Sequence, residues 1–261
     1  SVLATRTEPR APSAAMPEDL TARLHGELSR ATHIDPHSHI EPRAAAATGL
    51  ADILGYHYFT ELAHSAGVPR ERIEGEGVAA DARLDAVVAG LERFSNTVQH
   101  SWLLRIARDL YGFDDQTVTP DNWRALDASI RQRSGEPGWA DGVLEKSHIE
   151  AVFLTNDFDD PLEGFDTSRY VPCLRVDELV FHTGKPGVID RLAATAGIDV
   201  GSASQLTEAL GRVAARFRDR GAKAAAISLP PGFRPRDVDQ AAFAGSVEAV
   251  LRDGLAADTS H

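Results

Sequence analysis

The chain has 261 residues, of which 43% are hydrophobic and 25% are charged, a composition typical of a globular protein with a sizeable core. Its formal net charge of -12 argues against nucleic acid or an acidic membrane as the main partner, because phosphate binding requires a basic surface. The single cysteine, Cys173, excludes an intrachain disulfide framework and a cysteine-rich zinc site, and it fits a reducing compartment.

The sequence also gives an expectation for the cellular location of the protein. No apolar stretch approaches the roughly 20 residues required to span a bilayer. The first residues lack the apolar core of a signal peptide. We therefore expect a cytoplasmic protein without a membrane partner.

The chain opens with a segment of low sequence complexity. Residues 1–16 are rich in Ala, Pro, Ser and Thr and predict a disordered leader. The folded part is expected to start after Met16, where Pro17-Glu18-Asp19 is typical of a helix start. Leucines recur every four residues from Leu20 to Leu28, which predicts an amphipathic helix leading into the first strand.

A His-x-His pair follows at the end of that short strand, in the run from Thr32 to Ile40. Side chains two apart on a strand share a face, so His37 and His39 can reach a single divalent cation if that face is the inside of a barrel. The alternative interpretation is a coincidental pair on the surface. An Asp-Pro step before the pair and a charged loop after it favour a metal site.

A long helical region comes next. Residues 50–147 show helical spacing of apolar residues and no convincing strand, with a helix-capping sequence at Thr119-Pro120-Asp121. A stretch of this length is too long for one simple strand-to-strand crossover. We therefore predict a helical insertion over residues 49–147, packed over one end of a barrel or sheet.

Short apolar strands then return among helices. Near-continuous apolar strands separated by helices are typical of a parallel sheet covered on both faces. Together with the strand before His37, these segments give four expected strands. The expected strands are residues 149–156, 170–176 and 223–229, and the expected helices are residues 188–196, 205–220 and 238–255.

Several motifs resemble, in chain order, the uronate isomerases, a branch of the amidohydrolase superfamily. The resemblance covers residues 33 to about 230. It is carried by Asp35-Pro36-His37-Ser38-His39, Leu50-Ala51-Asp52-Ile53-Leu54, Tyr56-His57-Tyr58, His100-Ser101-Trp102, Leu110-Tyr111-Gly112-Phe113, Thr155-Asn156-Asp157-Phe158-Asp159-Asp160-Pro161 and Leu174-Arg175-Val176-Asp177.

The resemblance implies a (β/α)8 TIM barrel of the metal-dependent amidohydrolase type, with its site at the carboxyl ends of the strands. The implied reaction interconverts the aldose and ketose forms of a hexuronate, as in glucuronate to fructuronate. By resemblance, His37 and His39 bind a divalent metal, with zinc the expected ion. His57 and Tyr58 match catalytic positions of the pocket.

By the same resemblance, Arg175 and Asp157 bind the substrate, Arg175 by pairing with the uronate carboxylate. Each residue also has a simpler structural interpretation. Arg175 can form a salt bridge with Asp177 or Glu178. His57 and Tyr58 can pack between helical segments, and the Asp157 region can be a solvated turn.

The chain departs from the family in length. It supplies about the first four of eight strands, and the family's further histidine and its eighth-strand aspartate have no counterpart here. We expect residues 17–48 to form the first helix and strand, and residues 148–261 to form strands two to four with their helices. Four strands cannot close a barrel.

Three explanations of this half-barrel are open. The favoured one is that the chain needs a missing C-terminal half, or a second chain that supplies it. The others are a homo-oligomer whose copies exchange strands, and a shortened, catalytically silent subunit. A hydrolase, lyase or decarboxylase on the same barrel is the alternative enzyme class, because a fold does not fix the chemistry.

Overall fold

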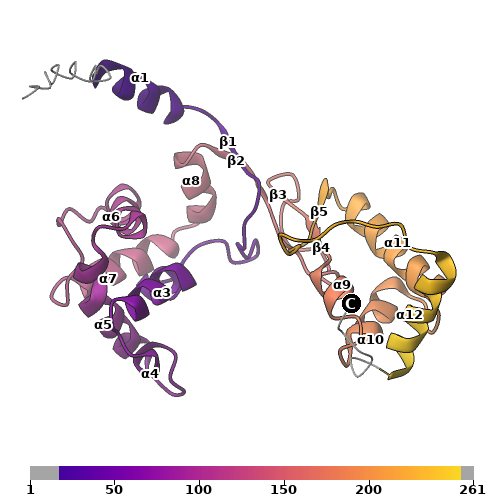
Figure 1. The fold of residues 1–261 in the computed structure, drawn as a ribbon. Coiled ribbons are helices and arrows are strands. Elements are labelled where there is room, and N and C mark those ends of the chain that lie inside the picture. The colour runs from indigo at the N-terminus through magenta and orange to yellow at the C-terminus, as the bar shows by residue number, and fades with distance from the viewer. Residues whose placement is uncertain (1–17, 254–261) are drawn as a thin grey trace, which may run out of the picture.

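A computed structural model describes residues 18–253, so the leader predicted over residues 1–16 lies outside the described residues. Its helices and strands follow the predicted order closely (Figure 1). The helices are α1 (Glu18–Leu28), α2 (Leu50–Leu54), α3 (His57–Ser65), α4 (Arg70–Ile73), α5 (Ala80–Gly90), the 3-10 helix η1 (Leu91–Phe94), α6 (Val98–Tyr111), α7 (Trp123–Ser134), α8 (Trp139–Lys146), α9 (Asp177–Phe181), α10 (Val188–Ala196), α11 (Ala203–Asp219) and α12 (Gln240–Asp253). The strands are β1 (His33–Asp35), β2 (Ile149–Phe153), β3 (Tyr170–Val171), β4 (Cys173–Arg175) and β5 (Ala224–Ala226).

The strands form one parallel row in sequence order. β1 pairs with β2 and β2 with β3, while β4 pairs with β5, and every pairing is parallel. A bridge between Asn156 and Leu174 joins the two sets. The predicted strand over residues 170–176 is thus divided into β3 and β4 by Pro172, which has no N–H to donate to the ladder. The four predicted strands are confirmed, and neighbours in space are neighbours in sequence.

Both outer strands of this row are open. Among residues 18–253, no further strand pairs with the free side of β1 or of β5. Ile34 on β1 is 59% exposed, and apolar Ile227 and Leu229 just after β5 are also exposed. Residues 18–253 therefore form an open α/β sheet with unpaired backbone at each side, and not a closed barrel.

Residues 50–147, for which a helical insertion was predicted, hold α2 to α8 with the 3-10 helix η1 and no strand. The inward faces of these helices build a core of their own, in which Leu50, Leu103, Trp123 and Ile130 are among the fully buried side chains. Helix α6 shows why the local sequence folds this way. Thr97 caps its first turn by accepting a hydrogen bond from the backbone of His100, and Gly112 ends it in the left-handed conformation at φ 67°.

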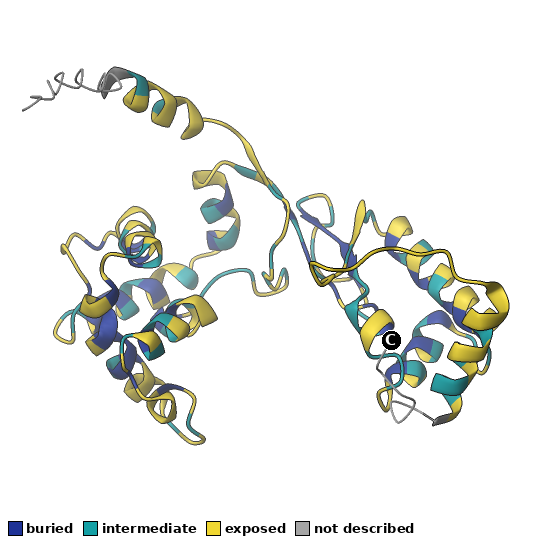
Figure 2. Ribbon diagram, in the orientation of Figure 1, coloured by how far each residue is buried: buried dark blue, intermediate teal, exposed yellow. Residues whose placement is uncertain are grey.

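A second group of helices follows β4. Helices α10, α11 and α12 were predicted within a few residues of their ends, whereas the five-residue α9 was missed. These helices build a separate core that includes Leu192 of α10 and Phe217 of α11. Phe158 and Leu162, from the loop after β2, belong to the same core. Figure 2 shows the buried faces of the two helix groups turned toward their own cores.

Helix α1 is amphipathic as predicted, yet its apolar side is uncovered. Leu24 and Leu28 are 51% and 65% exposed. Figures 1 and 2 show α1 projecting away from both helix groups. None of the helices in the described range, residues 18–253, combines the length and apolarity needed to cross a bilayer.

Candidate functional site

The site begins where the parallel strands end. His37 and His39 follow β1, Thr155 and Asp157 follow β2, and Arg175 is the last residue of β4. Parallel strands place their carboxyl ends at one edge of a sheet, so these side chains share the edge where α/β proteins bind ligands.

The two imidazoles lie beside each other. Their ring centroids are 5.0 Å apart and the rings meet edge to face, with an interplanar angle of 88°. Both side chains are exposed. They lie just past the strand, because β1 ends at Asp35 before Pro36, and the backbone N–H of His37 donates to the Asp35 carboxylate at 3.1 Å. The backbone N–H of Ser38 donates to the Phe153 carbonyl at 2.9 Å, which keeps the pair against the end of β2.

Thr155 connects the end of β2 to the histidine pair. Its hydroxyl donates to the carbonyl oxygen of Ser38 at 3.2 Å and lies 3.1 Å from Nδ1 of His39. The same region encloses a groove of about 430 Å³ whose lining includes His39, Thr155 and Asp157. The groove thus brings one of the expected metal ligands and one expected substrate-binding residue to a single place.

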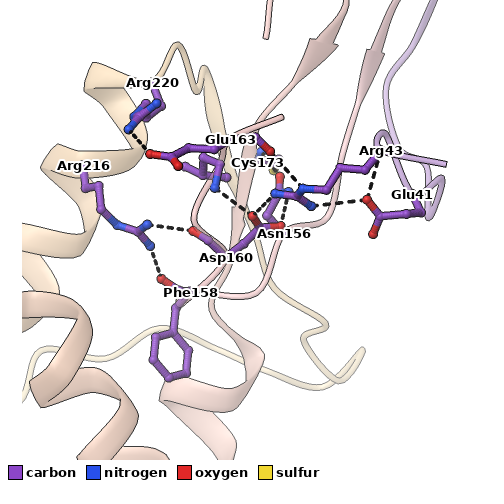
Figure 3. A network of polar contacts seen from close by, with 10 residues as sticks. Glu41, Arg43, Asn156, Phe158, Asp160, Glu163, Cys173, Arg216 and Arg220 are labelled. Carbon is purple, nitrogen blue, oxygen red and sulfur yellow. Dashed lines mark hydrogen bonds and ion pairs between the residues drawn. The ribbon is translucent and has the colours of Figure 1, made fainter. Parts of the chain in front are cut away.

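A polar network fixes the loops that line this groove (Figure 3). Arg43, in the loop after β1, donates from Nη2 to the Asp160 carboxylate at 2.7 Å and from Nε to the Glu163 carbonyl at 2.9 Å. Partial burial alone would raise the pKa of Asp160, but hydrogen bonds from Arg43, the Leu162 backbone and Asn156 outweigh it. The pKa of Asp160 is therefore held below its ordinary value, and the carboxylate stays charged.

Two further arginines reach the same loop from the helices. Arg216 of α11 donates to the carbonyls of Phe158 and Asp160 at 2.6 and 2.7 Å. Arg191 of α10 contacts the Asp159 carboxylate at 2.8 Å. Sequence reasoning missed Arg43, Arg191 and Arg216 as supports of the site. Their partners lie far away in the chain, so no local spacing could have indicated them.

Arg175 forms an ion pair with Asp177, which is the structural alternative to substrate binding given above. Its Nε lies 3.4 Å from the Asp177 carboxylate, and the other oxygen of that carboxylate accepts from the Ser228 backbone at 3.1 Å. The Arg175 side chain remains 42% exposed. Its role in binding substrate stays a prediction.

His57 and Tyr58 lie at the start of α3, and both are exposed. They form an aromatic cluster with Tyr56, in which the ring centroids of His57 and Tyr58 are 4.3 Å apart. His57 lines a second cavity, of about 660 Å³, between α2, α3, α4 and α5. His39 does not line this cavity, and His57 does not line the groove beside His39. The two histidines therefore face different cavities. The catalytic roles of His57 and Tyr58 also stay predictions.

The donor chemistry of the histidine pair suits a divalent transition metal, because neutral imidazole nitrogens are common zinc ligands. Within the described residues 18–253, no three His, Cys, Asp or Glu side chains converge where they could hold one ion. The residues therefore fit a metal in part. They provide two ligands, and the remaining ones would have to come from outside this range.

The chain is similar in sequence to a known protein over most of its length. The curated uronate isomerase of Rhizorhabdus wittichii is 29% identical over 218 residues, which cover 77% of this chain and 46% of that protein. The chain is thus similar in sequence to part of a uronate isomerase. No protein-family model matches it.

Solved structures show that the fold is shared with uronate isomerases. The uronate isomerase of Thermotoga maritima has a TM-score of 0.76 at 18% identity, covering 90% of this chain and 55% of that one. The glucuronate isomerase of Caulobacter crescentus has a TM-score of 0.77 at 18% identity, covering 91% of this chain and 55% of that one. The resemblance inferred from the motifs is confirmed, and the chain spans about half the length of the relatives it matches.

Proposed function

We propose that these residues form the metal-binding half of a uronate isomerase that interconverts the aldose and ketose forms of a hexuronate. The observation that carries the proposal is the adjacent placement of His37 and His39 at the carboxyl ends of parallel strands. It occurs in a chain whose sequence and fold are similar to uronate isomerases. The strands described above would then be the first four of a (β/α)8 barrel.

The chemistry of such an isomerase has to move a proton between neighbouring carbons. A base removes the proton beside the carbonyl, an ene-diolate forms, and the proton returns to the adjacent carbon. A divalent metal held by His37 and His39, with zinc the expected ion, would supply Lewis-acid polarisation of the substrate oxygens. His57 and Tyr58 would donate or accept protons at substrate hydroxyls.

Arg175 and Asp157 would bind the substrate at the same edge. The planar guanidinium of Arg175 can form two parallel hydrogen bonds with the uronate carboxylate. Its present contact with Asp177, at 3.4 Å, is long for a hydrogen bond and leaves the side chain partly exposed. Asp157 is exposed at the groove and can accept hydrogen bonds from sugar hydroxyls.

A closed barrel would require strands beside β1 and β5 that these residues do not supply. The exposed Ile34 on β1 and the exposed Leu24 and Leu28 on α1 support a partner that covers this side. We propose that the remaining half of a longer polypeptide, or a second chain equivalent to it, provides that cover. A homo-oligomer is the competing assembly.

The same proposal divides the chain into functional segments. Residues 17–48 bring the first helix and the histidine pair, residues 49–147 form the helical insertion, and residues 148–261 bring strands two to four. A cytoplasmic location accompanies the proposal and is supported by the single, buried Cys173.

The decisive experiment is an isomerase assay on the polypeptide purified from its native source, whatever its length. We expect turnover of a hexuronate, and we expect both His37→Ala and His39→Ala to abolish turnover and metal retention while the circular dichroism spectrum is preserved. His25→Ala, an exposed histidine on α1, is the control and should leave both unchanged. Absence of hexuronate turnover in the wild-type polypeptide would overturn the proposed activity, and unchanged metal content in both variants would overturn the metal site.

A further inference from the structure

We propose that Thr155 is a positioning residue that holds His39 in the tautomer whose Nε2 carries the free lone pair. The inference rests on the proposed metal-binding role of His39 and adds a residue outside the ligand set. It follows from two contacts of one hydroxyl group, which lies 3.2 Å from the Ser38 carbonyl oxygen and 3.1 Å from His39 Nδ1.

The single proton of the Thr155 hydroxyl decides the direction of its two hydrogen bonds. A threonine hydroxyl has one proton to donate, and a carbonyl oxygen can only accept. If the Thr155 hydroxyl donates to Ser38, it can bond to His39 only by accepting from an Nδ1–H group. Both hydrogen bonds are therefore formed together only when the neutral ring is protonated at Nδ1, which leaves Nε2 unprotonated.

The surroundings fix this arrangement. Thr155 is half-buried directly after β2, and the Ser38 backbone is itself bound to the Phe153 carbonyl of that strand. The His39 ring, in contrast, is exposed. Without the hydroxyl, water would offer either ring nitrogen an equivalent partner, and the ring would lose its fixed orientation.

Residues that bind the second nitrogen of a metal-ligating histidine set its tautomer and orientation, and their loss commonly weakens metal binding 10- to 100-fold. Thr155 occupies this place for His39. The contacts with Ser38 and His39 join the loops after β1 and β2, so a purely structural tie between those loops is the competing explanation.

The test compares four forms of the full chain: wild type, Thr155→Val, Thr155→Ser and Thr207→Val. Valine keeps the shape of threonine but removes both hydrogen bonds, whereas serine keeps the hydroxyl. Thr207 on α11 is the matched control, because its hydroxyl also donates to a backbone carbonyl, that of Ala203 at 2.9 Å, away from the histidine pair.

Two measurements are made on each form. The tautomer of His39 is read without metal from the ¹⁵N chemical shifts of its ring nitrogens, at an alkaline pH where imidazoles are neutral, with His39→Ala identifying the signal. Zinc affinity is read by competition with a chromophoric chelator.

We expect the Nδ1–H tautomer to dominate in wild type, Thr155→Ser and Thr207→Val, and to lose that dominance in Thr155→Val. Zinc binding should weaken about tenfold in Thr155→Val alone. A His39 tautomer that is the same in Thr155→Val as in wild type would overturn the inference, and so would weakened binding that Thr155→Ser fails to restore. If His37→Ala and His39→Ala leave zinc binding unchanged, the proposed metal site fails, while the metal-free tautomer measurement still decides the role of Thr155.

Discussion

His100 is a buried polar side chain in the helical core, only 6% exposed, on the first turns of α6. Its Nε2 has no hydrogen-bond partner among the described residues 18–253. Burial disfavours the charged imidazolium and lowers the pKa of His100 below its ordinary value of 6.5. The fold therefore prefers the neutral ring.

This preference makes stability depend on pH. Below about pH 6.5 the unfolded chain binds a proton at His100 that the folded chain resists, so the free energy of unfolding falls as pH decreases through that range. We expect His100→Gln to reduce the loss of stability between about pH 7.5 and 5.5 relative to wild type, as measured by urea unfolding. The exposed His25 provides the control, His25→Gln, which should keep the wild-type pH dependence; an identical slope in His100→Gln would contradict the prediction.

Individual residues also show what the sequence could and could not predict about the site. The sequence predicted that His37 and His39 share a strand face, but β1 ends at Asp35, and the two rings lie side by side in the loop that follows. The contact of Arg43 with Asp160 could not be predicted, since the two residues are 117 positions apart and each is unremarkable in its own segment. Long-range pairs of this kind are set by how loops meet after the strands have paired.

At the scale of elements, a glycine at the end of α6 and a glycine inside α8 have opposite effects on stability when alanine replaces them. Gly112 ends α6 with a φ of 67°, a conformation that side chains with a Cβ rarely adopt. Gly142 lies inside α8 (Trp139–Lys146), and a Cβ added there would meet no atom within 4 Å. The backbone conformation at position 112 therefore requires glycine, whereas glycine at position 142 only weakens its helix.

We expect Gly112→Ala to lower the free energy of unfolding by about 1 kcal/mol, because alanine is strained in the left-handed region. Gly142→Ala should raise it by about 0.5 to 1 kcal/mol, because alanine favours the helix interior. Both variants add one methyl group in open space, so each is the control for the other. Tryptophan fluorescence during urea unfolding measures both, and changes of the same sign would contradict the prediction.

The elements also show why some boundaries were predicted and others were not. Helix α10 (Val188–Ala196) was predicted at its observed ends, and in the structure a glycine in the left-handed conformation flanks it on each side, at positions 187 and 197. The strand over residues 170–176 was expected to be continuous, but Pro172 divides it. The five-residue α9 was missed, because a helix this short has too few turns to show a periodic pattern.

At the scale of the whole molecule, Leu144, Val152, Leu154 and Tyr170 form a small apolar cluster around β2, and the described residues also build two larger cores. One lies among α2 to α8, and the other lies among α9 to α12 with the loop after β2. All three tryptophans, Trp102, Trp123 and Trp139, belong to the helical insertion. Their fluorescence therefore reports on one core, whereas circular dichroism reports on both.

We expect the two probes to give different urea transitions, because each core can lose its packing separately. Leu126→Ala and Leu192→Ala delete fully buried leucines from the first and second core, respectively, each at a cost of roughly 2 to 5 kcal/mol. Leu126→Ala should shift the fluorescence transition, and Leu192→Ala should shift only part of the circular dichroism transition. Coincident transitions that move together in both variants would show a single cooperative unit instead.

The pairing of His33 on β1 with Ile149 on β2 has a consequence for biosynthesis. As the nascent chain leaves the ribosome, β1 emerges long before its neighbour, and the entropic cost of joining them grows with the length of free polypeptide between them. Early compaction of α2 to α8 shortens that free length, so β1 would be drawn toward β2 by an already ordered segment. We therefore expect the insertion to compact first during synthesis and the pairing of β1 with β2 to form afterwards.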